Sequence, residues 1–97
     1  MSIRMGSHEF DSVSYDAEGD VLYLRRGAPR PARETLASPE GHAIRLSANG
    51  EIIGITIVSA MWVAERDGQI TVTVPRPSLA PEQLRTSATD LAAALAA

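Results

Sequence analysis

The chain has 97 residues, of which 44% are hydrophobic and none is cysteine, and its formal net charge is -3 at pH 7. This length makes one domain with one core. The lack of cysteine excludes disulfides and thiolate metal sites. The negative charge disfavours a nonspecific nucleic-acid binder, because phosphate binding needs an excess of positive charge. No apolar run approaches the ~20 residues that cross a bilayer, and we expect a cytoplasmic protein.

The first ten residues include the stretch Gly-Ser-His-Glu-Phe and lack the apolar segment of a signal peptide. We therefore interpret residues 1–9 as a flexible or cloning-derived leader. Residues 10–77 are predicted to form an antiparallel β domain, and residues 78–97 a C-terminal helical segment.

An acidic turn between two apolar runs predicts a β-hairpin over residues 12–24. Gly19 is expected to take the positive φ that such a turn needs. Tyr15 and Tyr23, one on each strand, are interpreted as core residues.

The same turn carries Asp16, Glu18 and Asp20 at every second position, which is similar to the start of a calcium-binding loop. Glycine falls at the fourth place of that motif instead of the sixth, and the twelfth place holds Gly27 instead of a bidentate Glu. A solvated turn is therefore the favoured interpretation. The alternative is a small enzyme or a cation-binding domain that uses this turn.

All nine basic residues are arginines, and four of them lie close together around two prolines: Arg25, Arg26, Arg30 and Arg33. An acidic stretch precedes them, so opposite charges can pair across the hairpin and its neighbouring strand. The alternative is an RNA-binding module, or a site for an acidic protein, in the Arg25–Arg33 loop.

The dipeptide Asn49-Gly50 between apolar runs predicts a second hairpin over residues 43–58, because both residues tolerate the positive φ of a type I′ turn. Ile53, Ile55 and Ile57 are expected on one face of residues 52–58, and the other face is also largely apolar. This pattern indicates a central strand. We expect the core to cover one face of it, and a helix or another subunit to cover the other.

Residues 69–74 alternate with period two, which predicts a strand with one wet face near a sheet edge. Residues 65–68 are interpreted as the turn before it. Trp62, which precedes that turn, is a candidate anchor for a partner or a core residue.

From Pro81 onwards, apolar residues at three- and four-residue spacing predict one helix that includes Leu84, Leu91 and Leu95. The alternative is a shorter helix that begins after a break and is capped by Ser87. Such a helix can pack on the sheet or pair with a second chain.

In two stretches the chain resembles the small bacterial domain-of-unknown-function family 2283, also called YuzE-like: Tyr15-Asp16-Ala17-Glu18-Gly19-Asp20-Val21-Leu22-Tyr23-Leu24, and the run from Ala43 to Ala60. The positions that carry the family motif are Tyr15, Asp16, Glu18, Asp20, Tyr23, Gly50 and Gly54. Arg45 and Ser47 stand where the family commonly has acids, and Thr56 stands where it commonly has Glu. These departures argue against an acidic ligand site on the second hairpin.

The resemblance implies no known reaction and no catalytic residue. Some family members resemble antitoxins, since they are short proteins encoded beside a small toxin-like neighbour. This similarity implies a protein partner.

The residues themselves offer little for catalysis. The two imidazoles are His8, in the leader, and His42, which shares a loop with Ser38 and Glu40 and is interpreted as a solvated loop histidine. A Gly-rich phosphate loop and a zinc-binding spacing are both absent from the sequence. We expect no catalytic residue, no metal and no cofactor, and favour binding over catalysis.

These elements predict an α+β fold: an antiparallel β-sheet of five or six strands in consecutive hairpins, with one C-terminal helix. We expect a protein of unknown function that acts as a small protein-binding module, either as an antitoxin-like partner of a small neighbour-encoded protein or by self-association as a dimer. The residues expected to bind the partner are Arg25, Arg26, Arg30, Arg33, Trp62, Leu84, Leu91 and Leu95.

Overall fold

The computed structural model describes residues 2–76 and 80–96. Its elements, in chain order, are β1 (Ile3–Met5), β2 (His8–Phe10), β3 (Ser12–Asp16), β4 (Val21–Arg25), β5 (Glu34–Ala37), β6 (Ala43–Leu46), β7 (Ile52–Val58), α1 (Ala60–Asp67), β8 (Gln69–Val74), β9 (Glu82–Ser87) and α2 (Ala88–Ala96). Met1 of the predicted leader, Pro77 of the predicted β domain, and residues 78, 79 and 97 of the predicted helical segment lie outside the described residues.

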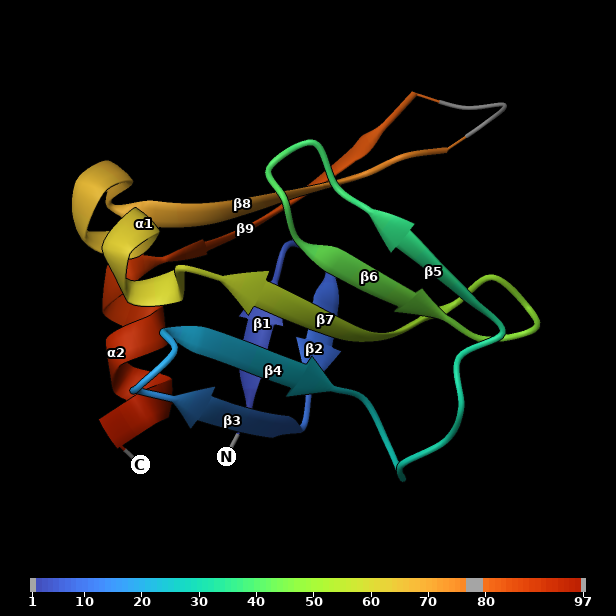
Figure 1. Ribbon diagram of the computed structural model, residues 1–97, viewed down its shortest axis with the longest axis horizontal. Helices are drawn as coiled ribbons and strands as arrows, with labels where there is room; N and C mark the ends of the chain where they lie inside the picture. Colours follow the sequence, from blue (N-terminus) through green and yellow to red (C-terminus); the bar gives the residue numbers. More distant parts are fainter. Residues whose placement is uncertain (1, 77–79, 97) are drawn as a thin grey trace.

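Five antiparallel strands form the main sheet, in the order β3-β4-β7-β6-β5 (Figure 1). The two predicted hairpins are confirmed as β3–β4 and β6–β7, and β7 is the central strand as expected. Gly50 has a φ of 79° in the turn before β7, which is the conformation that Asn-Gly turns favour.

The inner face of the main sheet presents aliphatic side chains to the core. Leu24 pairs with Ile55, and Ile55 pairs in turn with Ile44. A register shift on β6 pairs Leu46 with Ile52, so Ile52 joins this core and not the face of Thr56. The expected alternation of 52–58 is therefore wrong at its start, because a bulge changes which face a side chain occupies.

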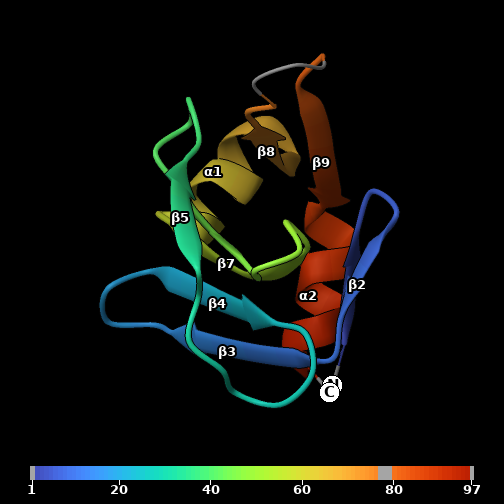
Figure 2. The ribbon, with the colours of Figure 1, turned by 90° about the vertical axis from the view of Figure 1, so that its right-hand side faces the viewer.

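A second layer covers the inner face. In Figure 1 the β1–β2 hairpin lies behind the main sheet, and Figure 2 shows α2 on the same side of that sheet. The β8–β9 hairpin completes this layer, with Val72 and Leu84 fully buried. The α+β class and the antiparallel sheet are confirmed, whereas the described residues hold two helices and two separate two-stranded hairpins.

The prediction that residues 1–9 lie outside the fold is wrong for the described part of that segment. Ile3 and Met5 are buried, and Ile3 pairs with Phe10, which is fully buried. Gly6, in the tight turn between β1 and β2 with a φ of 61°, donates its backbone N–H to the carbonyl of Arg85 at 3.1 Å. The leader interpretation failed because three apolar residues that are spaced singly give no local sign of burial.

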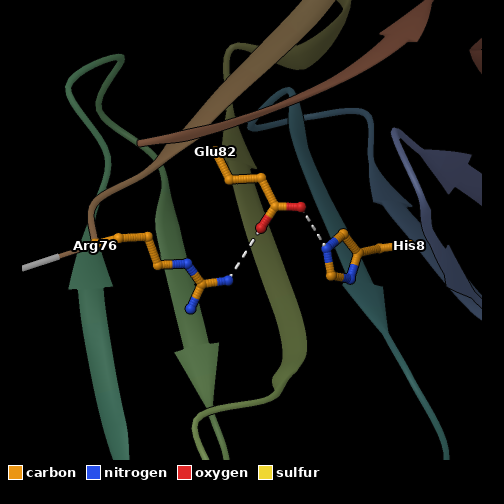
Figure 3. A network of polar contacts seen from close by, with 3 residues as sticks. All are labelled: His8, Arg76 and Glu82. Atoms are coloured by element: carbon orange, nitrogen blue, oxygen red, sulfur yellow. Dashed lines mark hydrogen bonds and ion pairs between the residues drawn. The ribbon is translucent and has the colours of Figure 1, made fainter. Parts of the chain in front are cut away.

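A charged cluster ties the first hairpin to the last one (Figure 3). The carboxylate of Glu82 lies 3.0 Å from His8 Nε2 and 3.0 Å from Arg76 Nη2. The hydrogen bond from Arg76, and then that from His8, lower the pKa of Glu82. The cluster therefore holds β2 against the β8–β9 hairpin.

The predicted helix from Pro81 is wrong over residues 82–87, which form β9 and pair with β8. Leu84 and Thr86 are buried while their neighbours are exposed or half-buried, so the burial has period two. The alternative with a shorter helix is confirmed: Ser87 Oγ accepts the N–H of Asp90 at 3.0 Å, which caps α2.

The helix α1 was not predicted, and residues 65–67 extend it instead of forming a turn. It ends at Gly68, which has a φ of 75° and donates its N–H to the carbonyl of Ala64 at 2.8 Å. Within the part of the chain that the structure describes, neither helix has the length and apolar character needed to cross a membrane.

The burial of the first hairpin predicts the effect of Phe10→Ala. This change should lower the free energy of unfolding by ~3 to 5 kcal/mol, because it removes a fully buried aromatic side chain and leaves a cavity. Urea denaturation followed by circular dichroism measures it. The matched change Glu9→Ala, at an exposed neighbour, should cost less than about 1 kcal/mol. Equal effects of the two changes would show that the hairpin does not belong to the core.

Candidate functional site

The acidic turn between β3 and β4 holds the start of α1. Asp20 accepts the N–H of Ala60 with its backbone carbonyl at 3.1 Å. Its carboxylate accepts the N–H of Met61 at 2.8 Å and that of Trp62 at 3.2 Å. Ser59, at the N-cap position, makes no side-chain capping bond. Asp20 therefore caps the N-terminus of α1, although it lies far from this helix in the sequence.

Tyr15 completes this contact, since its hydroxyl donates to Asp20 Oδ1 at 2.7 Å. Burial opposes the ionisation of Asp20, but the hydrogen bonds from Met61, Tyr15 and Trp62 together lower the pKa of Asp20 below its usual value. The same bond raises the pKa of Tyr15.

The other motif acids have a local role or none that the structure records. Asp16 Oδ1 accepts the backbone N–H of Glu18 at 3.2 Å and that of Gly19 at 3.4 Å, which closes the turn. The positive φ belongs to Asp20, at 53°, and not to Gly19 as expected. Among residues 2–76 and 80–96, no cluster of three or more His, Asp or Glu side chains is placed to hold a metal. Cation binding by this turn stays a prediction.

The outer face of the main sheet carries exposed apolar residues, and we call it the open face. Its middle row follows from the strand register and contains Ser14, Tyr23, Thr56, Ala43 and Ala37. Tyr23 is 47% exposed, so its interpretation as a core residue is wrong. Val58, two residues along β7 from the partner of Tyr23, is also 47% exposed.

The open face carries opposite charges at its two ends. Asp16 lies at one end of the face, on the edge strand β3. Arg25 and Arg45 lie at the other end, on either side of Gly54, with which each of them pairs. A side chain at Gly54 would meet the carbonyl of Leu24 at 3.1 Å and Arg45 Cδ at 3.6 Å. This motif glycine thus leaves room for the side chain of Arg45.

Two hollows adjoin at His42. One, of about 350 Å³, lies on the open face over β5, β6 and β7, and Val58 is among the residues that line it. The other, of about 360 Å³, lies between the loop before β6, α1 and the start of β8. Its polar lining includes Glu40 and Arg66.

His42 is only 4% exposed, so its interpretation as a solvated loop histidine is wrong. Its Nδ1 accepts the backbone N–H of Val58 at 3.1 Å, and the backbone N–H of His42 donates to Ser38 Oγ at 3.0 Å. A backbone amide can only donate, so neutral His42 carries its proton on Nε2. Burial lowers the pKa of His42, although the charge of Glu40 opposes this shift.

The four predicted arginines differ in their contacts and exposure. Arg25 Nε donates to the carbonyl of Gly27 at 3.1 Å, and Arg26 Nε donates to that of Glu9 at 3.3 Å. Arg30 and Arg33 are exposed. A role of this loop in RNA binding stays a prediction.

The predicted apolar contacts divide between surface and core. Trp62 is 59% exposed, and the guanidinium of Arg66 lies 4.5 Å from the centre of its ring. Leu84 and Leu91 are buried and Leu95 packs against the core, so they offer little surface to a partner. Sequence reasoning missed Val58, because its apolar run predicted burial on both faces of β7.

The contact at the start of α1 predicts the effect of Asp20→Asn. This change should lower the free energy of unfolding by ~1 to 2 kcal/mol at neutral pH, because it removes the capping charge and one acceptor oxygen. The exposed motif residue gives the control Glu18→Gln, which should change it by less than about 0.5 kcal/mol.

The pH dependence of that difference follows from the lowered pKa of Asp20. The stability that the carboxylate contributes is present above its unfolded pKa of about 3.9 and is lost as the pH falls through the lower folded value. Urea titrations at several pH values should show the gap between wild type and Asp20→Asn narrowing in acid. A gap that stays constant down to acid unfolding would contradict the capping role.

For His42, nitrogen-detected NMR at pH 7 should show a neutral ring with the proton on Nε2 and a titration midpoint below the ordinary histidine value of about 6.5. As the pH falls, the unfolded chain binds this proton at a higher pH than the folded chain does. His42 therefore contributes stability that is present above about pH 6.5 and is lost as the pH falls toward the folded pKa. His42→Gln assigns the signal, and an Nδ1-protonated ring would rule out the contact with Val58.

Comparison with known proteins bears on β3 to β7 and the first residue of α1. The family described as a protein of unknown function (DUF2283) has a model that matches residues 12–60. Comparison with curated proteins and with solved structures gives no match. The matched segment, just over half of the chain, contains Asp20, the open face and His42, and the chain belongs to the DUF2283 family of proteins of unknown function.

Proposed function

We propose that the chain is a small protein-binding module that binds another protein on its open face. The observation that carries the proposal is the position of Tyr23 and Val58. They are two of the three large hydrophobic residues that are exposed in the described chain, and they lie together on a face that the second layer leaves uncovered. Exposed apolar residues that cluster in this way are typical of interaction sites.

The other residues of the middle row suit a flat contact. Ser14, Ala37, Ala43 and Thr56 have small side chains, so a partner can approach closely around Tyr23. Covering the exposed half of Tyr23 is worth about 2 kcal/mol at the usual value per area. Aromatic residues surrounded by small polar contacts are frequent centres of binding energy.

The proposal includes the antitoxin-like version, in which the chain binds and masks a small neighbour-encoded protein in the cytoplasm. It ranks above the enzyme alternative because the carboxylate of Asp20 is occupied by amides of α1 and by Tyr15. It ranks above RNA binding because the open face carries the acid Asp16 as well as arginines.

The proposal predicts the effect of Tyr23→Arg on bound protein. A tagged chain is purified at native level from its own cells, which also express an untagged copy, and mass spectrometry identifies any protein held in stoichiometric amount. Wild type should retain such a protein, and Tyr23→Arg should retain at least about tenfold less, because a charge replaces the apolar centre of the contact. The matched change Ala48→Arg, at an exposed residue of the turn between β6 and β7, should retain as much as wild type.

Thermal unfolding of both variants verifies that the fold survives. Retention of the same protein by folded Tyr23→Arg would overturn the assignment of the open face. Absence of any bound protein from wild type would overturn the binding function itself.

A further inference from the structure

We infer that the occupant of the open face is a second copy of this chain, packed face to face with its strands running in the opposite direction. The inference rests on the proposed function and names its partner. It follows from the opposite charges at the two ends of the open face and from the small side chains in its middle row.

The charge pattern is the first argument. Asp16 marks one end of the open face, while Arg25 and Arg45 mark the other. Asp11, beside Arg25, offsets one of the two arginine charges, and the basic end keeps a net positive charge. A twofold axis across the strands lays each strand on its own copy, and brings Asp16 over Ser12 of the second copy, whose cross-strand partner is Arg25. The face is therefore complementary to itself.

The middle row is the second argument. The same axis lays this row on its own copy, so that Tyr23 meets Tyr23 of the second copy, with the small side chains Ser14 and Thr56 as its cross-strand neighbours. Two tyrosines at a twofold axis can stack with an offset. Sheets packed in this manner lie ~10 Å apart, a spacing that the small residues permit.

The two sides of β7 supply the third argument. After the register shift, its outer face carries Gly54, Thr56 and Val58, and the apolar side chain of Val58 is 47% exposed. The second layer covers the inner face, and no helix among the described residues covers Thr56 or Val58 on the outer one. A second copy provides the missing cover.

The size of the face sets the strength of the contact. Five strands spaced ~4.8 Å apart, with about five residues each rising ~3.3 Å, span roughly 400 Å² in projection. This area lies below the ~800 Å² per partner of a standard stable interface. The pair should therefore be weak, with dissociation in the micromolar range and a dimer fraction that rises with concentration.

Sedimentation velocity on the purified chain, from low to high micromolar concentration in low salt, tests the inference. Wild type should shift from monomer to dimer. Asp16→Arg and Arg25→Glu should each weaken this association about tenfold or more, because the twofold axis makes every charge reversal count twice. Circular dichroism verifies that both variants fold, and Ala48→Arg, which adds a charge at an exposed turn residue, is the control that should associate like wild type.

Mixing the two variants in equal amounts provides the decisive measurement. In the mixed pair, Arg at position 16 meets Glu at position 25 of one copy, and Asp16 meets Arg25 on the other side, so attraction returns at both ends. The mixture should recover dimer that neither variant forms alone. If both variants fold and wild type dimerises, a mixture that stays monomeric overturns the inference.

A wild-type chain that stays monomeric at all concentrations also overturns the inference. If Tyr23→Arg then still loses a different protein in the purification from cells, the proposed function survives without self-association. If wild type holds no protein in that purification either, both the inference and the proposed function fail.

Discussion

Asp20 accepts hydrogen bonds from the first amides of α1, and this contact directs the chain as it leaves the central strand β7. Ser59 has a φ of 56° and makes no side-chain capping bond, and the helix is instead capped by Asp20, which lies 39 positions before Ser59. Tyr15 holds the same carboxylate. The chain thereby turns away from β7 into α1 and reaches β8, whose hairpin lies in the second layer. The acidic motif of the first hairpin therefore stabilises the start of α1.

The one-sided arrangement follows from this direction. α2 and the two small hairpins all lie against the inner face, where the aliphatic residues of the main sheet are buried. The outer face keeps Tyr23 and Val58 exposed. Small residues around them and charges at the two ends turn this face into a surface that fits a partner, which is the basis of the proposed binding and of the proposed pairing. His42 helps to hold Val58 in place on this face, because its ring accepts a hydrogen bond from the amide of Val58.

Local signals predicted the parts of the fold that depend on neighbours in sequence. Asn49-Gly50 and the acidic turn marked both hairpins of the main sheet, and the alternation in residues 69–74 marked β8. The same signals failed at residues 82–87, where Pro81, Glu82 and the spacing of Leu84 indicate a helix. Pairing with β8 outweighed that weak preference. They failed at α1 as well, because its cap lies far away in the chain.

The sequence by itself determined the antiparallel class, the two main hairpins, the central position of β7 and the family, since turn chemistry and apolar patterning act over a few residues. Only the tertiary structure decided that the first residues join the core, that His42 is buried, and that Leu84 and Leu91 are core residues while Tyr23 is exposed. Each of these depends on which segments meet across the sheet. The sequence of an apolar strand indicates that its faces are buried. It does not indicate whether the residues that bury them belong to the same chain or to another one.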